Sequence, residues 1–371
     1  MTTLRLDHLP GPPADAGFAH GRALRALLEP AFLDAYFTRI GQAIRVTRDD
    51  ITQQAARWLP NLPEQYQDEI DGMAAGAGVP TTTVAEFLYA DIARSSDTAA
   101  PVGPMCSSVI AALPLEQQPA HATWIARNCD WLTPTLMRGC AAVVHETPHR
   151  IPVMAVGIRG DIDIDTGINA EGLWLHLHTL HAKDDPPANR TCISWLFWAR
   201  EALETCATLD ELERFIEATG RDRGVFAIAG EGPTDRAAVF ECTRATHTRH
   251  DIDPAQPACV TNHSLSRRDD RPSDTPRAPG LPGGSLTRYR ALRGRRDDQA
   301  PTQGPGDLMH LLAAPDVEMR SATWLRTIYS AVVRPRDASI WFASGHHDGA
   351  PAASTGAWTR VTPPWQRLLP H

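Results

Sequence analysis

The chain changes character at Cys106, and this change limits the possible folds more than any other feature of the sequence. Before this residue, apolar side chains recur every three or four positions, which is the period of an amphipathic helix. After it, short apolar runs alternate with turn residues, as in antiparallel sheets. Cys106 stands at the junction, directly after a loop rich in Ser, Asp, Ala and Pro. We therefore predict a mixed α+β fold with a helical N-terminal part and a sheet-rich remainder.

The N-terminal part is predicted to form a helical layer. Its first stretch carries apolar residues at helical spacing and contains Pro30, which favours a break. Thr83 and Glu86 form a capping-box pattern that indicates the start of the last helix. The predicted helices cover 14–44, 51–59, 63–77 and 83–95.

The part after Cys106 is predicted to form an antiparallel sheet system interrupted by helices. The segments 266–284 and 296–306 are rich in Arg, Asp, Pro and Gly, and we expect no regular structure there. The predicted strands are 107–113, 123–128, 141–146, 153–158, 173–179, 224–229, 237–241, 258–261, 327–333, 338–343 and 357–361. The predicted helices are 192–204, 209–218, 285–295 and 307–314.

Composition narrows the choice of partners and compartment. The formal net charge is −8, and the 36 basic residues form no block, which argues against nucleic acid or an anionic membrane as the main partner. No apolar run reaches the length of a signal peptide or a membrane span. The seven cysteines lack the spacing of a disulfide framework. We expect a reduced, soluble, cytoplasmic protein.

Cys106 admits two interpretations. A buried cysteine that opens a strand is the simpler one, because a free cysteine behaves as a small apolar residue. Alternatively, the chain is cleaved after Met105, and Cys106 becomes an N-terminal residue. Its free α-amine would have a pKa of ~7.7–8.0, so the amine could accept the thiol proton without a separate histidine.

Charged and amide side chains downstream could serve such a cysteine. In the sequence Arg-Asn-Cys-Asp, Arg127 would favour a thiolate and Asp130 could hold an amine, although a surface turn is an alternative interpretation. On a regular strand these two side chains point to opposite faces, so we expect a bulge or turn at Asp130. Asn169 lies at a glycine-flanked turn before a strand, and Asn262 follows another strand. An amide held at a strand end is a good oxyanion donor.

Together these motifs resemble a known class of enzymes. Cys106, Arg127-Asn-Cys-Asp130, Gly-Ile-Asn169-Ala-Glu-Gly-Leu, Thr-Asn262-His and Ser-Leu-Thr-Arg288 stand in the order found in N-terminal nucleophile hydrolases. The set is most similar to the isopenicillin N acyltransferase-like branch, with the choloylglycine hydrolases as more distant relatives. The segments 16–21, 69–76 and 340–345 also resemble that branch, so the resemblance spans nearly the whole chain.

This resemblance implies a four-layer αββα sandwich and a residue-by-residue assignment. Cys106 would be the nucleophile, with its own amine as base. Asn262 would be an oxyanion donor, assisted by Asn169 or by backbone near Cys106. Arg127 and Asp130 would tune and hold the nucleophile, and Arg288 would support the site electrostatically.

The family's precursor is cleaved just before its cysteine by an N-to-S acyl shift. The resemblance therefore implies cleavage between Met105 and Cys106. The products would be a small helical subunit, 1–105, and a large subunit, 106–371. Together they would form one structural domain as a heterodimer, without a cofactor or a metal.

The resemblance further implies a small-molecule amide or acyl substrate. Hydrolysis of a linear amide is our first expectation, and transfer of an acyl chain from an acyl-CoA to an amine is the alternative. For the substrate pocket we name Trp131, His176, His178 and His263.

Two interpretations from other classes remain open at this stage. His176 and His178 share one face of a predicted strand, and they could bind zinc with His346, His347 and Asp348 in a metallohydrolase. That strand face could equally be half exposed, or it could line the pocket. The chain could also be an uncleaved protein that binds ligands without catalysis.

Overall fold

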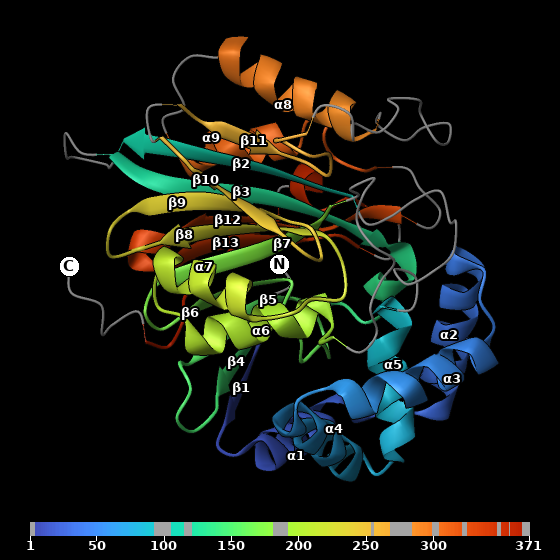
Figure 1. The fold of residues 1–371 in the computed structure, drawn as a ribbon. Coiled ribbons are helices and arrows are strands. Elements are labelled where there is room, and N and C mark those ends of the chain that lie inside the picture. The colour runs from blue at the N-terminus through green and yellow to red at the C-terminus, as the bar shows by residue number, and fades with distance from the viewer. Residues whose placement is uncertain are drawn as a thin grey trace.

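Two β-sheets packed face to face form the centre of the structure, a computed structural model (Figure 1). It describes residues 4–92, 105–114, 121–180, 192–253, 256–267, 284–298, 304–320, 325–346, 350–355 and 357–365. Within these residues, no helix is long and apolar enough to cross a membrane.

The larger sheet, sheet A, has eight strands among the described residues, in the order β1-β4-β5-β6-β7-β8-β9-β10. All its pairings are antiparallel except that of β1 with β4, which is parallel. Nearly continuous burial of β7 and β8 shows that layers cover both faces of the sheet here. The strands are β1 Arg5–Pro10, β4 Cys140–Glu146, β5 Val153–Ile158, β6 Thr166–Asn169, β7 Leu173–Thr179, β8 Val225–Glu231, β9 Arg236–Cys242 and β10 His247–Asp251.

The smaller sheet, sheet B, is antiparallel and has six strands in the order β11-β2-β3-β12-β13-β14. The strand that begins at Met105 is its second member, so Cys106 lies on an inner strand. The strands are β2 Met105–Pro114, β3 His121–Leu132, β11 Ala258–Val260, β12 Leu325–Arg334, β13 Ser339–Ser344 and β14 Thr359–Val361.

Two pairs of helices cover the outer faces of the sheets. Helices α6 and α7 pack on sheet A, and α8 and α9 pack on sheet B (Figure 1). This arrangement confirms the predicted α+β sandwich with four layers. The helices are α6 Trp195–Thr205, α7 Leu209–Ala218, α8 Ser285–Asp298 and α9 Pro305–Leu312.

Among the described residues of the N-terminal part, five further helices lie beside the sandwich (Figure 1). The predicted break at Pro30 is confirmed, because Pro30 begins a new helix, and the last helix begins at Thr81 rather than Thr83. The helices are α1 Pro13–Leu24, α2 Pro30–Ile44, α3 Arg48–Trp58, α4 Glu64–Ala77 and α5 Thr81–Ile92. Short 3-10 helices cover Arg25–Leu27, Leu59–Asn61, Thr133–Met137, Pro335–Asp337 and Ala353–Thr355.

The expectation of a purely helical N-terminal part is wrong in one respect. Strand β1 joins the edge of sheet A, where Arg5 pairs with Ala141 and Pro10 with Glu146. The segment preceding Cys106 therefore contributes to the central sandwich as well as to the helices beside it. Of the two segments predicted to be irregular, 268–283 and 299–303 lie outside the described residues.

Candidate active site

Cys106 is the second residue of β2 and is buried, with 3% of its surface exposed. It pairs with Cys129 on β3, so both side chains are on the face of sheet B that meets sheet A. Its nitrogen, sulfur and carbonyl oxygen each contact a different side chain, as described below. The five residues Cys106, Arg127, Asp130, Asn262 and Arg288, separated by up to 182 positions in the chain, form one cluster.

Arg127 approaches the sulfur from β3. Its Nη2 lies 3.4 Å from the Sγ of Cys106, and its Nη1 lies 2.9 Å from the Oδ2 of Asp165. Nη1 also donates to the Oγ1 of Thr166, and Thr166 is hydrogen-bonded to Tyr329, which donates to Asp165. Burial opposes the charge of Arg127, but Asp165 and neighbouring groups hold its pKa well above the usual value. A permanent positive charge therefore lies beside the sulfur.

Arg288 approaches from the opposite face of sheet B, on the first turn of α8. Its Nη1 donates to the carbonyl oxygen of Cys106 at 2.6 Å and to the Oγ of Ser107 at 2.7 Å, while Nη2 donates to the Oδ1 of Asn262 at 2.8 Å. Asp130 lies 3.8 Å from the same guanidinium. Burial raises the pKa of Asp130 to about 6, against the influence of Arg288 and a hydrogen bond from Thr327.

The predicted bulge at Asp130 is absent from the described pairing of β2 and β3. Their register is continuous from Met105, opposite Asp130, to Pro114. The alternation of side chains is therefore kept, with Arg127 on the inner face beside the sulfur of Cys106 and Asp130 on the outer face beside Arg288. The irregularity is instead on β12, between Thr327 and Tyr329.

Asn262 binds the nitrogen of Cys106, through a different atom than predicted. The backbone N–H of Cys106 donates to Oδ1 at 3.0 Å, and the Nδ2 of Asn262 donates to the carbonyl oxygen of Thr179 at 3.0 Å. The orientation of the amide is fixed chemically, because Arg288 can only donate and a carbonyl can only accept. Asn262 thus acts as an acceptor that orients the nitrogen, whereas the sequence suggested an oxyanion donor.

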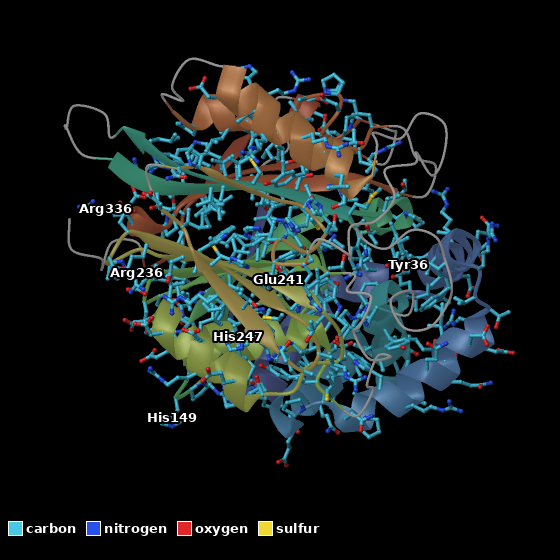
Figure 2. The ribbon with its side chains drawn as sticks, turned by 45° about the horizontal axis from the view of Figure 1, so that its top comes forward. Tyr36, His149, Arg236, Glu241, His247 and Arg336 are labelled. Atoms are coloured by element: carbon cyan, nitrogen blue, oxygen red, sulfur yellow. The ribbon has the colours of Figure 1, made fainter. Side chains whose placement is uncertain are left out.

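The turn after Asn262 is held by Glu241 on β9 (Figure 2). Its carboxylate accepts hydrogen bonds from the hydroxyl of Ser264, the backbone of Leu265, and the backbone and hydroxyl of Ser266. Burial opposes the carboxylate charge, but these bonds and a contact with His250 lower the pKa of Glu241 to about 2. Glu241 remains charged and fixes the loop that carries Asn262.

Asn169 is not part of the cluster. Its Nδ2 donates to the carbonyl oxygens of Leu203 at 2.9 Å and Cys206 at 2.7 Å, at the end of α6, and its Oδ1 accepts from the backbone of Leu173. Both amide hydrogens are therefore used by backbone carbonyls. The structure gives Asn169 the task of joining the β6–β7 turn to α6, and it corrects the expectation that Asn169 assists at the oxyanion.

A partly open cavity lies beside the cluster. Cys129, the cross-strand neighbour of Cys106, lines it, as do Asp165, Thr166 and Tyr329, which surround Arg127. Its other walls are mostly apolar. They include Leu88, Trp131, Val143, Val156, Ile158 and Leu196.

The four residues proposed for the pocket have separate positions. Trp131 lines the cavity. His263 lies on the outer side, where its Nδ1 is 2.8 Å from the Oγ of Ser285 and its ring meets Tyr289 edge-on. His176 and His178 lie between the sheets and both contact Ser108.

The zinc interpretation finds no support in the part of the chain that the structure describes, which contains no group of three or more potential metal ligands. His347 and Asp348 lie outside the described residues. Burial lowers the pKa values of His176 and His178 well below the usual range, and the nearby charge of Arg127 acts in the same direction.

Sequence reasoning did not find several residues that hold the cluster together. Asp165, Thr166 and Tyr329 surround Arg127, and Thr179 fixes the amide of Asn262. The repeated Asp-Ile-Asp-Ile-Asp pattern before Thr166 was a possible signal for Asp165. Nothing in the local sequence distinguishes Tyr329 from an ordinary core residue of its strand.

Comparison with known proteins gives one family match and several structural similarities. The sequence model of the acyl-coenzyme A:6-aminopenicillanic acid acyl-transferase family matches residues 117–348. No curated protein matches the sequence.

The similar solved structures include proteins from three different organisms. Penicillin V acylase from Agrobacterium tumefaciens has a TM-score of 0.47 at 14% identity, over 64% of this chain and 83% of that one. A Caenorhabditis elegans ortholog of N-acylethanolamine-hydrolyzing acid amidase has a TM-score of 0.45 at 13% identity, over 62% and 93%. A mutant of the conjugated bile acid hydrolase from Clostridium perfringens has a TM-score of 0.43 at 11% identity, over 69% and 92%. At these identities and TM-scores, the similar structures do not assign a function to this chain.

The four-layer sandwich, with this cluster around a cysteine at the start of an inner strand, defines an enzyme of the N-terminal nucleophile hydrolase class. The family match spans more than half of the chain and includes Arg127, Asp130, Asn262 and Arg288, while Cys106 precedes it. The chain belongs to the acyl-coenzyme A:6-aminopenicillanic acid acyl-transferase family.

Proposed function

We propose that the protein is a self-processing cysteine enzyme that cleaves the amide bond of a small N-acyl compound through a thioester. The observation that carries the proposal is the convergence on Cys106: Arg127 at the sulfur, Asn262 at the nitrogen and Arg288 at the carbonyl oxygen. An ordinary buried cysteine needs none of these partners. Together they hold a nucleophile with its nitrogen and sulfur in fixed positions.

Processing would use the same cysteine. The Sγ of Cys106 attacks the carbonyl carbon of Met105, the S–C bond forms, and the C–N bond between the two residues breaks as the nitrogen takes the thiol proton. Water then hydrolyses the thioester, which leaves a carboxylate on Met105 and a free thiol and amine on Cys106. Asn262 supports this step because it already binds the nitrogen that becomes the amine.

In the catalytic cycle, the free amine accepts the thiol proton and the thiolate attacks the substrate carbonyl. The guanidinium of Arg127 stabilises negative charge on the sulfur and on the oxygen of the tetrahedral intermediate. The amine product leaves with a proton, and water releases the acid from the thioester. Arg288 keeps the backbone of Cys106 and the amide of Asn262 fixed through both half-reactions.

The cavity beside Cys129, the cross-strand neighbour of Cys106, supports a proposal for the acyl part of the substrate. Its apolar walls, with Leu88, Trp131 and Leu196, suit an apolar acyl group. We therefore expect N-acyl amides with aromatic or aliphatic acyl groups to be better substrates than N-acetyl compounds.

Intact-mass measurement combined with a substrate panel tests this proposal. We expect the purified protein to give two fragments divided between Met105 and Cys106, and Cys106→Ala to stay intact and inactive. Cys242→Ala is the matched control, because Cys242 is also buried but lies on β9 away from the cluster, and it should be cleaved and active. Activity in Cys106→Ala would refute the mechanism. A single full-length mass without activity would instead favour the binding role.

The family description favours acyl transfer as a second candidate function. A transferase would give an N-acyl product from an acyl-CoA thioester and an amine, and its rate would depend on the amine. Incubation of processed enzyme with both compounds, followed by analysis of products, separates transfer from hydrolysis. Full activity after treatment with a chelator would exclude the metallohydrolase interpretation.

A further inference from the structure

Ser108 lies two residues after Cys106 and is completely buried between the sheets. Its Oγ is 2.8 Å from the Nε2 of His176 and 2.8 Å from the Nε2 of His178, both on β7. One hydroxyl has a single proton, so it donates to one imidazole and accepts from the other. The catalytic steps described above use none of these three side chains.

The groups at the two ends determine the direction of every hydrogen bond in this network. The indole of Trp174 can only donate, and its Nε1 lies 3.0 Å from the Nδ1 of His176. His176 must therefore carry its proton on Nε2 and donate it to Ser108. At the other end, the carbonyl oxygen of Thr261 can only accept, and it lies 2.9 Å from the Nδ1 of His178. His178 therefore carries its proton on Nδ1 and accepts the proton of Ser108 on Nε2.

The resulting order is Trp174 to His176 to Ser108 to His178 to Thr261, with both imidazoles neutral. This order cannot be reversed, because an indole N–H does not accept a hydrogen bond and a carbonyl does not donate one. The network therefore does not conduct protons. Its physical effect is to fix the positions of the groups that it joins, in a buried environment where an unmade hydrogen bond is costly.

The groups that it joins surround the proposed nucleophile. Ser108 belongs to β2, the strand of Cys106, and pairs across strands with Arg127. Thr261 directly precedes Asn262, which binds the nitrogen of Cys106. His176 and His178 belong to sheet A, so the network ties that sheet to two separate segments of the site.

We propose that Ser108 is a positioning residue that, through His176 and His178, holds Cys106 and Asn262 at a fixed distance from each other. The effect of Ser108 on the rate of amide cleavage rests on the proposed function. The directions of its hydrogen bonds are independent of that function. Loss of the hydroxyl would leave the Nε2 atoms of both imidazoles without a partner, while their Nδ1 atoms stay bound to Trp174 and Thr261. The support that His178 gives to the Thr261–Asn262 turn would then be weaker. A displacement of about 1 Å at a reacting group costs on the order of 100-fold in rate.

The first test measures the protonation of the two imidazoles by nitrogen NMR on protein labelled with ¹⁵N-histidine, with signals assigned through His176→Gln and His178→Gln. We expect neutral His176 with the proton on Nε2 and neutral His178 with the proton on Nδ1 at pH 7. The opposite tautomer at either residue, or a charged imidazole, would overturn the network. This measurement needs neither a substrate nor processing of the chain.

The second test compares Ser108→Ala with Ser108→Thr, which restores a hydroxyl. We expect Ser108→Ala to lower kcat for the amide substrate on the order of 100-fold with little change in KM, and Ser108→Thr to recover much of the loss. Ser330→Ala is the matched control, because Ser330 is also buried in sheet B and donates one hydrogen bond, to Asn128 on the outer side.

Equal kcat in Ser108→Ala and the wild type, or equal losses in Ser108→Ala and Ser330→Ala, would overturn the positioning role. If Ser108→Ala does not fold, Ser108→Thr and the NMR measurement decide the question. A wild-type protein that is uncut and inactive would refute the proposed function while leaving the tautomer result intact, so the two failures are distinguishable.

Discussion

Arg288 joins four other residues of the site. One guanidinium binds the carbonyl oxygen of Cys106, the hydroxyl of Ser107 and the amide oxygen of Asn262, and it lies beside Asp130. Arg288 and Asp130 are both fully buried. Burial lowers the pKa of Arg288, and the charge of Asp130 partly offsets this effect. The charge on each partner thus depends on the other.

This dependence predicts different responses of stability and activity. Arg288→Met leaves Asp130 buried without its counter-charge, and we expect a stability loss of about 3 kcal/mol. The double variant Arg288→Met with Asp130→Asn removes both charges and should regain part of that loss. Neither variant should be active, because the contacts to Cys106 and Asn262 are gone in both. Urea unfolding measures the predicted change in stability, and amidase assays measure the predicted loss of activity. A double variant that is no more stable than the single one would contradict the charge argument.

At this scale the sequence identified residue types well but not the atoms that act. The motif Thr-Asn262-His predicted an amide near Cys106, and the Oδ1 of Asn262 accepts a hydrogen bond from the backbone nitrogen of Cys106. Which end of the amide faces Cys106 depends on Arg288 and Thr179, which are distant in sequence. Asn169 stands in a glycine-flanked turn motif, yet its partners are carbonyls at the end of α6. A turn motif alone cannot reveal which neighbour uses its polar atoms.

Among the elements, helices α1 and α4 make an unusually close crossing (Figure 1). Glycines four residues apart on each helix, Gly17 and Gly21 on α1 and Gly72 and Gly76 on α4, lie against the backbone of the other helix. A Cβ atom at Gly21 would be 2.0 Å from the carbonyl oxygen of Met73, and one at Gly72 would be 2.1 Å from that of Ala14. Backbone cannot yield to this overlap as a flexible side chain can.

We therefore expect Gly21→Ala to destabilise the protein by more than about 3 kcal/mol or to prevent folding, as overpacking of a rigid contact does. Gly294→Ala is the control, because Gly294 lies on α8 and a Cβ there meets nothing within 4 Å. That variant should be unchanged or more stable by up to about 1 kcal/mol, through helix propensity. Thermal unfolding compares the two. A stability of Gly21→Ala close to that of the wild type would show that the helices can separate at little cost.

The elements were largely predictable because their periodicity is local. The helices and most strands after Cys106 follow directly from apolar spacing. Strand β1 was missed because it is short, mostly exposed and without an alternating apolar pattern, and it pairs with residues more than 130 positions away. The register of β2 and β3 and the irregularity on β12 likewise depend on pairing between strands, which no single segment encodes.

For the whole molecule, buried histidines make stability depend on pH. Burial lowers the pKa of four histidines, that of His20 to about 4 and the others well below the usual range. The four are His20, His145, His176 and His178. In the unfolded chain each binds a proton below pH ~6.5, so the unfolded state takes up more protons than the folded state as the pH falls.

Folding stability should therefore decrease below pH 6.5, by at most ~1.4 kcal/mol per pH unit for each histidine. Glu69 and Asp130 act in the opposite direction. Burial raises the pKa of Glu69 to about 7 and that of Asp130 to about 6, so both carboxylates bind protons first in the folded state.

The four buried histidines outnumber these two carboxylic acids. We therefore expect uncut Cys106→Ala to have a lower urea midpoint at pH 5.5 than at pH 7.5. His149→Asn, at an exposed turn with φ of 63° (Figure 2), should leave this difference unchanged. Equal midpoints would contradict the argument.

The pairing of β1 with β4 matters for what happens after the chain is cut. The segment before Cys106 supplies the edge of sheet A along six paired residues, and its helices share one apolar core with both sheets. A protein processed after Met105 would stay assembled without a covalent link, but its refolding would become a reaction between two molecules. Uncut protein should regain its structure at a rate independent of concentration, whereas the processed form should recover more slowly as it is diluted. Processing would thus turn a chain that can refold alone into an assembly whose recovery depends on the meeting of its two parts.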